Sequence, residues 1–158
     1  MSLNFPRLVA AAILALTMAA ASLTNAQLVE RLGMRRLSHT ALGGFVGLSL
    51  LLVLAALLGV ASLTLFIGMM AALFFLFGLV APNFNALAME PQGDNAGMAS
   101  SVIGFATTGA GALAGGYVGH MFDGTVLPLV LGFLGLSAAA FAVVVWVEGP
   151  KGIFRPTH

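Results

Sequence analysis

Four long stretches without any Asp, Glu, Lys or Arg constrain the fold of this 158-residue chain more than any other feature: 8–29, 40–89, 95–122 and 124–147. A helix that crosses the hydrocarbon core of a bilayer needs about 20 consecutive apolar residues. The first, third and fourth stretches each fit one such helix, and the second has 50 residues, enough for two helices with a tight connection. We therefore expect five transmembrane helices, over about 8–26, 40–60, 63–81, 98–119 and 126–147.

The composition agrees with an integral membrane protein. Charged residues make up 7% of the chain and hydrophobic residues 60%, and the mean hydropathy is +1.08. A soluble globular domain carries roughly 25% charged residues. The apolar stretches are continuous instead of alternating at every second residue, which favours helices over strands. The predicted fold class is an all-α membrane bundle in one transmembrane domain, with almost no mass outside the bilayer.

The positive charges predict the orientation of this bundle. The loop 27–39 and the tail 148–158 lie on the same side of a five-helix protein and hold Arg31, Arg35, Arg36, Lys151 and Arg155, whereas only Arg7 lies opposite. Lys and Arg in short loops mark the cytoplasmic side of a membrane protein. We expect both of these segments and the loop 82–97 to be cytoplasmic, and the N-terminus to be outside.

The N-terminus also permits a second interpretation. Arg7, the apolar run from Leu8 and the segment Thr24–Ala26 before Gln27 are compatible with a secretory signal peptide and its cleavage site. Cleavage would leave the arginine-rich loop outside the cell, which the positive-inside rule opposes. The transmembrane interpretation is therefore preferred.

The arginine-rich loop carries a recognisable pattern, "AQLVERLGMRR" at 26–36. It resembles the short cytoplasmic loop of the major facilitator superfamily, in which a small residue and an acid precede Arg-x-Gly-x-Arg-Arg. The matching positions here are Ala26, Glu30, Arg31, Gly33, Arg35 and Arg36. The family more often has Gly at the small position and Asp at the acid. A tight turn between two helices uses a glycine because glycine adopts positive φ, and Glu30 can pair with an arginine of this or a neighbouring loop.

A second stretch, 81–105, resembles the link between helices ten and eleven of the drug:proton antiporter branch, the bicyclomycin-resistance type. In this link Pro-Asn ends one helix, Ala-Leu-Ala follows, and Gly-x-Ala-Ser-Ser/Ala opens the next helix. The matching residues are Pro82-Asn83, Ala86-Leu87-Ala88 and Gly97-Met98-Ala99-Ser100-Ser101.

Together the two resemblances cover helices eight to twelve, about five-twelfths of a transporter. They imply the C-terminal portion of a proton-coupled efflux transporter for small amphipathic compounds, in the bacterial inner membrane. Its partners would be membrane lipid and the missing N-terminal half, and a proton gradient would take the place of a cofactor. Two alternatives remain open: a small non-transporting membrane subunit, and a half-transporter that dimerises.

Two sets of residues are candidates for packing and for substrate contact. Small residues recur every three or four positions along one face of 98–119, where they would permit close helix packing: Ser101, Gly104, Thr108, Gly111, Gly115 and Gly119. Methionine and aromatic side chains make adaptable apolar walls. The candidates for a cavity wall are Met69, Met70, Phe74, Phe75 and Phe77 with Phe105, Thr107 and Thr108.

The sequence lacks the residue patterns that proton coupling, metal binding and catalysis ordinarily require. The predicted spans contain no Asp, Glu, Lys or Arg near their centres, so a proton-coupling group of the usual kind is not among them. His39, His120 and His158 lack metal-ligand spacing, and no catalytic triad or phosphate-binding loop occurs, so neither an enzyme nor a metal site is expected. No basic patch suggests nucleic acid. His120 and Asp123 are close enough in sequence for a proton relay, but a solvated turn is the preferred interpretation.

Overall fold

The computed structural model describes residues 5–149 and consists of five α-helices and one short 3-10 helix. The elements are α1 (Phe5–Leu32), α2 (Met34–Leu57), α3 (Leu63–Met89), η1 (Glu90–Asn95), α4 (Ala96–His120) and α5 (Leu127–Glu148). There is no strand among residues 5–149, so the predicted all-α class is confirmed.

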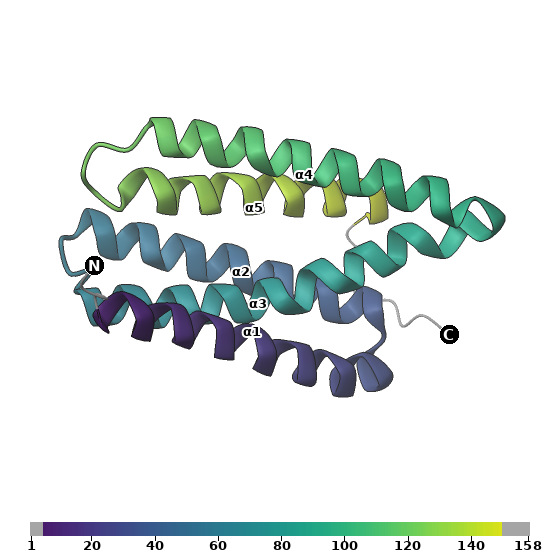
Figure 1. Cartoon of the computed structure of the whole chain (residues 1–158), viewed down its shortest axis with the longest axis horizontal. Helices are drawn as coiled ribbons and strands as arrows, with labels where there is room; N and C mark the ends of the chain where they lie inside the picture. The colour runs from purple at the N-terminus through teal and green to yellow at the C-terminus, as the bar shows by residue number, and fades with distance from the viewer. Residues whose placement is uncertain (1–4, 150–158) are drawn as a thin grey trace.

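Four continuous helical stretches within the described residues are long and apolar enough to cross a membrane. They are Ala11–Leu32, Met34–Leu57, Leu63–His120 and Leu127–Glu148. The count differs from the five predicted crossings because the third stretch has 58 residues and includes α3, η1 and α4. The chain reverses direction at η1, so α3 and α4 run antiparallel (Figure 1). The protein is thus a helical bundle of the multi-pass membrane type.

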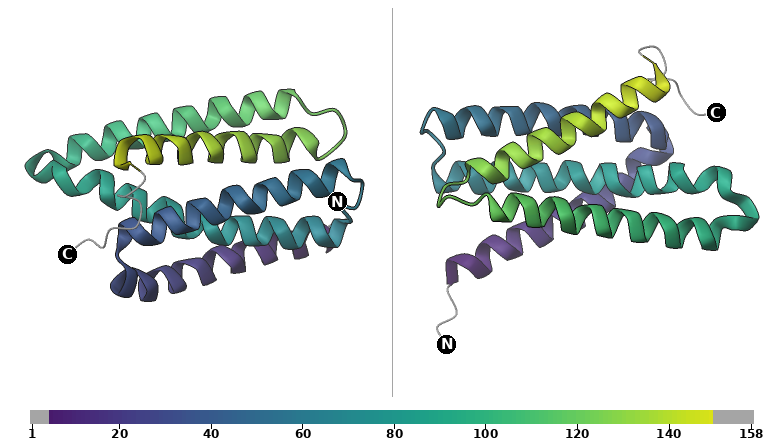
Figure 2. Two further views of the ribbon diagram at one scale, coloured as in Figure 1. Left: turned by 180° about the vertical axis from the view of Figure 1, so that it is seen from behind. Right: turned by 90° about the horizontal axis from the view of Figure 1, so that it is seen from above.

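The helices lie side by side in the order α1, α3, α2, α5, α4, which differs from their order in the sequence (Figures 1 and 2). Packing is most extensive between α2 and α3, between α2 and α5, and between α1 and α3. The last helix in this row, α4, has sparse contacts, which it makes with α5, with the adjoining η1 and, to a smaller extent, with α3. Helices α2 and α3 therefore form the centre of the bundle, and α1 and α4 form its two flanks.

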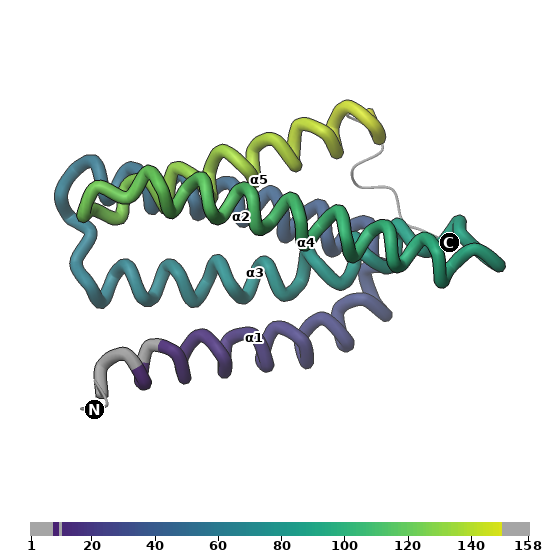
Figure 3. Tube along the Cα trace, turned by 45° about the horizontal axis from the view of Figure 1, so that its top comes forward, coloured from purple at the N-terminus to yellow at the C-terminus, as the bar shows by residue number. Residues whose placement is uncertain are grey.

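The connections alternate between the two ends of the bundle (Figure 3). The junction of α1 with α2, the 3-10 helix η1 and the end of α5 lie at one end. The start of α1, the α2–α3 loop and the α4–α5 turn lie at the other. The charged residues of 30–36 and Glu148 consequently share one end, which we call the basic end, while Asp123 lies at the opposite end.

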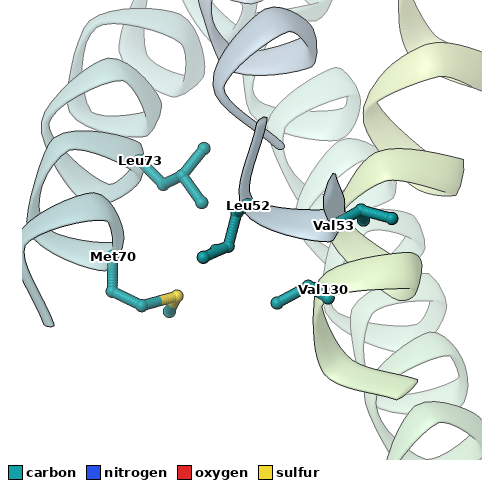
Figure 4. Packing of buried hydrophobic residues seen from close by; sticks show 5 residues of the cluster. All are labelled: Leu52, Val53, Met70, Leu73 and Val130. Carbon is teal, nitrogen blue, oxygen red and sulfur yellow. The ribbon is translucent and has the colours of Figure 1, made fainter. Parts of the chain in front are cut away.

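The apolar core joins the three central helices. Leu52 and Val53 of α2, Met70 and Leu73 of α3, and Val130 of α5 are all buried and contact one another (Figure 4). Figure 4 shows Leu52 between the side chains from α3 and Val130 of α5. In a bilayer, such helix contacts depend on close van der Waals packing, because lipid tails are as apolar as the side chains themselves.

Helix α1 is held against α3 by a close approach and by a polar pair. Ala21 is fully buried, and a Cβ atom added at Gly78 would lie 2.6 Å from its methyl group. One turn further along each helix, the buried Asn83 side chain donates a hydrogen bond to the side-chain oxygen of Asn25. The segment compatible with a signal-peptide cleavage site thus lies inside a continuous helix that is packed on α3.

The predicted loop at 27–39 is almost entirely helical. Helix α1 continues to Leu32 and α2 begins at Met34, so Gly33 is the single residue between them, with φ 77° and ψ 153°. The predicted limits of the loop differ because Gln, Glu and Arg favour a helix, although their polarity ends the apolar stretch. The positive φ expected for a glycine turn is present at Gly33.

The expected helix end at Pro82-Asn83 is also wrong. Helix α3 continues through Pro82 to Met89. A proline removes one backbone donor and crowds the carbonyl four residues earlier, but transmembrane helices tolerate it where other groups satisfy the backbone. The carbonyl that loses its amide donor at Pro82 is that of Gly78. The neighbouring carbonyl of Leu79 accepts a hydrogen bond from the side-chain Nδ2 of Asn83, 2.6 Å away. The reversal instead occurs in η1, where Gly93 has φ 45° and ψ −120°.

The α2–α3 connection, the α4–α5 connection and the end of α5 occur close to their predicted positions. The break at 58–62 contains Gly59 with φ 69°, and the hydroxyl of Ser62 accepts a hydrogen bond from the Leu65 amide at the start of α3. This is the side-chain cap expected at a helix N-terminus. Helix α5 ends at Glu148, and the Gly149 that caps it has a φ of 69°, which suits a glycine.

Candidate functional site

The basic end is built by the one-residue joint between α1 and α2. Because only Gly33 separates the two helices, the arginines project from helical turns rather than from a loop. Ala26, Glu30, Arg31 and Arg36 are exposed, and Arg35 is half-buried. Apart from Gly33 in the joint itself, the motif therefore has one residue that is half-buried, Arg35, and four that are exposed.

Glu148 at the last turn of α5 connects this motif to the end of the bundle. Its Oε1 atom lies 3.5 Å from Nε of Arg35 and 3.5 Å from Nε2 of His39. The Glu148 side chain is 16% exposed and that of His39 only 1%, whereas that of Arg35 is 40% exposed. One carboxylate thus bridges two basic side chains that are one helical turn apart on α2. We call these three residues the Arg35–His39–Glu148 cluster.

Some polar atoms of the cluster have no hydrogen-bond partner within the described residues. Nε of Arg35 and Oε2 of Glu148 are buried and have no hydrogen-bond partner there. The imidazole ring of His39 packs against the ring of Phe84 of α3, with centroids 5.7 Å apart. The cluster therefore lies where α2, α3 and α5 meet, and it has the capacity for further hydrogen bonds.

Two of these three residues, His39 and Glu148, are not among the site candidates predicted from the sequence. Glu148 was assigned only to the predicted cytoplasmic tail, and His39 was considered only as a metal ligand. The spacing of Arg35 and His39 places them on one helix face, but this signal required the knowledge that 34–40 is helical. The role of Glu148 could not be inferred without knowing that the end of α5 lies beside the start of α2.

The cavity candidates of α3 lie in or beside the core. Met70 is buried, and Met69 and Phe74 pack on the core cluster. Phe74 and Phe77 line a small pocket of about 160 Å³ together with Leu73 and two phenylalanines that sequence analysis did not select, Phe45 of α2 and Phe133 of α5. The rings of these two are 6.1 Å apart in an edge-to-face arrangement. Phe75 packs on a second buried cluster formed by Leu37, Ala41 and Leu79.

The cavity candidates of α4 are not brought to this pocket. Phe105 is 83% exposed, and Thr107 and Thr108 are exposed as well. The Thr107 hydroxyl donates back to the carbonyl of Ile103 in its own helix, 2.8 Å away. Within residues 5–149, the two groups of candidates do not form one cavity wall.

The predicted packing face of α4 has no neighbour within the described residues. A Cβ atom added at Gly104, Gly111, Gly115 or Gly119 would meet no atom within 4 Å. Ser101 is exposed, and its hydroxyl donates to the carbonyl of Gly97 in the same helix. Glycine-mediated packing occurs elsewhere, at Gly78 against Ala21 and at Gly132, where an added Cβ would lie 2.7 Å from a methyl group of Val118.

The opposite end of the bundle holds an open groove of about 510 Å³ between α4 and α5. Its walls are mainly apolar, and Tyr117 and Asp123 are among the residues that line it. The Asp123 carboxylate accepts hydrogen bonds from the hydroxyl and the amide of Thr125, at 2.6 and 2.9 Å, and these lower its pKa below the ordinary value. His120 and Asp123 are both exposed, and the partners of this carboxylate belong to Thr125.

No group of three His, Asp or Glu side chains among residues 5–149 is arranged to hold a metal ion. No protein-family model matches the chain, and no curated protein or solved structure is significantly similar to it. The functional interpretation therefore depends on the geometry of the basic end, the core and α4.

Proposed function

We propose that this chain is the C-terminal portion, about helices eight to twelve, of a proton-coupled efflux transporter of the major facilitator type, with small amphipathic compounds as substrates. The observation that carries the proposal is the joint at Gly33. A single glycine with φ 77° links two long apolar helices, and Arg35 follows it within reach of Glu148 on α5. A one-residue joint at the glycine of Arg-x-Gly-x-Arg-Arg is compatible with the short connection of the resembled family.

The contact between Arg35 and Glu148 suits a transporter that rocks between two states. Ion pairs with a partner as exposed as Arg35 contribute about 0–1 kcal/mol, so this pair can break and reform with little cost. Alternating access moves groups of packed helices around a site near the middle of the bilayer. A weak tie between α2 and α5 at one end of the bundle is compatible with such a motion.

The unoccupied face of α4 supports the same proposal. Its small residues leave a smooth surface without neighbours in residues 5–149, and a second group of helices can approach such a surface closely. In the proposed transporter this surface borders the central cavity, so Phe105, Thr107 and Thr108 would contact substrate there. Met69, Met70 and Phe74 would then support the α3 wall from the core.

The same observation also favours a second candidate, a small membrane subunit without transport activity. Such a subunit would use Gly104, Gly111, Gly115 and Gly119 to pack on a helix of a different protein. The two candidates differ in what must cover α4: the first half of a transporter, or an unrelated membrane protein.

A chimaera distinguishes them. The chain replaces helices eight to twelve of a drug:proton antiporter of the bicyclomycin-resistance type, and the accumulation of a fluorescent efflux substrate is measured with and without an uncoupler. We expect uncoupler-sensitive efflux from the chimaera and none from this chain expressed alone, because one half offers no opposing wall and no mid-membrane proton carrier. Gly115→Leu in the chimaera is the matched variant and should abolish efflux, whereas Leu131→Ile should not.

A chimaera that reaches the membrane in normal amounts but never transports contradicts the proposal and favours the subunit. Uncoupler-sensitive efflux by this chain alone, in cells without related pumps, contradicts it in another way, because a dimerising half-transporter would then be the better account.

A further inference from the structure

The groove between α4 and α5, about 510 Å³ in volume, takes no part in the proposed substrate cavity. It lies beside the turn that joins the two helices, at the end of the bundle opposite the basic end (Figure 1). Its lining includes Tyr117, Met121, Leu131 and Leu136, whose side chains are 47–68% exposed. Inside a bilayer, apolar side chains that the protein leaves uncovered contact lipid tails.

Two glycines of α5 shape the groove. At Gly132, an added Cβ atom would lie 2.7 Å from a methyl group of Val118, so α4 and α5 are in close contact there. At Gly135, which also lines the groove, an added Cβ atom would meet no atom within 4 Å. The two helices therefore meet closely at one level and leave a space beside it that a slender apolar chain can fill.

The length of the groove corresponds to one leaflet of a bilayer. Along α5 its lining extends from Leu127 to Leu136, a rise of about 14 Å at ~1.5 Å per residue. The hydrocarbon core of a bilayer is about 30 Å thick, and α5 is long enough to span it from Leu127 at the turn to the exposed Trp146 near the basic end. The groove therefore reaches from the membrane surface to about the centre of the bilayer, as an acyl chain of one leaflet does.

A single charge lies at the end of the groove nearest the membrane surface. Of the described residues that line the groove, Asp123 in the α4–α5 turn alone is charged. Both hydrogen bonds that Thr125 donates to this carboxylate end on Oδ1, which leaves Oδ2 to accept a bond from a ligand. The same bonds lower the pKa of Asp123, so the carboxylate is ionised at neutral pH. A cationic group is the electrostatic complement of this end of the groove.

An apolar groove that ends at a carboxylate favours a lipid with a cationic headgroup over a wholly apolar occupant. A primary ammonium has three N–H donors, and its charge-assisted hydrogen bond to a carboxylate is stronger than a neutral one. A quaternary ammonium has no N–H to donate. Tyr117 lies in the last turn of α4, the level at which tyrosines are enriched beside lipid headgroups.

We propose that this groove binds one phospholipid with a primary ammonium headgroup, in the leaflet at the end of the bundle opposite the basic end. One acyl chain lies along Leu131, Gly135 and Leu136 of α5. The ammonium donates a hydrogen bond to Oδ2 of Asp123.

The lipid site is separate from the face of small residues on α4. The α4 residues of the groove include Ala114, Val118 and Met121, whereas the face of small residues includes Gly111 and Gly115. At about 3.6 residues per turn, the centres of the two sets lie roughly a third of a turn apart around the helix. A protein partner on the small residues therefore does not have to cover the groove.

Native mass spectrometry of the full chain tests the proposal. The chain is released from micelles with equal amounts of dioleoyl phosphatidylethanolamine and dioleoyl phosphatidylcholine, which differ only in the methyl groups on the headgroup nitrogen. We expect the first bound lipid to be phosphatidylethanolamine about twofold to fivefold more often, the range for one solvent-accessible ion pair. Asp123→Asn keeps an oxygen that accepts the bonds of Thr125 but should remove this preference. Asp94→Asn, the same change of charge at an exposed residue of the basic end, should retain it.

Two glycine variants test the position of the acyl chain. Gly135→Leu should lower the retention of both lipids roughly twofold or more, because the new side chain takes the place of the acyl chain and removes its dispersion contacts. Gly109→Leu adds the same side chain to α4 outside the groove, where an added Cβ also meets nothing within 4 Å, and should change retention little.

Three outcomes overturn the proposal. Equal retention of the two lipids by the wild type is one, and a preference that survives Asp123→Asn is another. A dimer of the chain without bound lipid is the third, because it assigns the groove to a second copy.

A second measurement keeps Asp123 in place and uses a bilayer. In vesicles of the same two lipids, a carbodiimide activates exposed carboxyls, and the headgroup amine then displaces the activating group as a urea and forms an amide. Peptide mass spectrometry should find more lipid amide at Asp123 than at Asp94, and Gly135→Leu should lower the amount at Asp123 alone. Equal amounts at the two carboxyls in both proteins contradict the proposal.

The lipid site does not depend on the proposed transport function. The chain alone suffices for both measurements, whereas efflux requires the chimaera. The two proposals can therefore fail separately.

Discussion

Helices α2 and α4 are alike in length and apolar character, yet they have opposite environments. Helix α2 has 24 residues, eight of which are buried, whereas none of the 25 residues of α4 is buried. The glycines show the same contrast. Two of the three glycines of α2, Gly43 and Gly44, face Phe141 and Leu76 within 4 Å, whereas Gly47 and all seven glycines of α4 face open space within the described residues.

This contrast teaches that apolar composition determines where a chain crosses a membrane but not which helices it packs against. Lipid and side chains are equally apolar, so burial in the bundle needs complementary shapes. Helix α2 meets such shapes on α3 and α5, whereas α4 has only sparse contacts with α5, η1 and α3. Its small residues remain a surface for a partner outside residues 5–149.

The largest expected difference between the two regions comes from shortening a leucine in each. Leu73 of α3 is 1% exposed and contacts the core, whereas Leu113 of α4 is 79% exposed. Leu73→Ala should lower the free energy of unfolding by about 2–5 kcal/mol, because it leaves a cavity. Leu113→Ala should change it by less than about 0.5 kcal/mol. Reversible unfolding in mixed micelles measures both, and equal losses would show that the core is misplaced.

Enlarging a glycine sharpens the comparison. Gly78→Ala places a methyl group 2.6 Å from the Cβ of Ala21, where something must shift, and overpacking of this kind costs about 1–3 kcal/mol. Gly115→Ala meets nothing within 4 Å, and alanine favours helix over glycine, so the isolated chain should be slightly stabilised. Thermal unfolding of the two variants checks this. A loss at Gly115 in the isolated chain would mean that α4 is packed after all.

The smallest effect concerns the turn that joins α4 to α5. The Asp123 pKa is lowered chiefly by the Thr125 hydroxyl and then by the Thr125 amide. A carboxyl with a lowered pKa stabilises the folded turn above about pH 4, and this contribution is lost as the pH falls through the folded-state value. The midpoint of an Asp123 carboxyl ¹³C titration should therefore rise in Thr125→Val. An unchanged midpoint would show that the hydroxyl does not hold this turn.

The sequence was sufficient for the parts of the fold that depend on local signals. The helices α4 and α5 begin and end within two residues of their predicted limits, because His120–Leu127 holds the turn residues between two uncharged runs. The positive φ of Gly33 was also expected from the motif. Local signals failed at Pro82, where the hydrogen bond of Asn83 to Asn25 depends on the tertiary position of α1.

The candidate site was less predictable for the same reason. The meeting of His39 with Glu148 joins residues more than a hundred positions apart, and no periodicity encodes it. The four phenylalanines of the small pocket come from three helices, and only the two on α3 had been selected. Long-range contacts of this kind depend on the spatial order of the helices, α1, α3, α2, α5, α4, which local sequence patterns do not predict.

The account depends most directly on the placement of the basic end in the cytoplasm, with the α4–α5 turn outside. Because the natural chain has no cysteine, single variants at Gln27, Asp94 and Thr125 each carry one thiol at an exposed position. A membrane-impermeant maleimide is applied to intact cells, with permeabilised cells as the control. We predict that Thr125→Cys is labelled in intact cells, and that Gln27→Cys and Asp94→Cys are labelled only after permeabilisation. Labelling of Gln27→Cys or Asp94→Cys in intact cells would contradict the account.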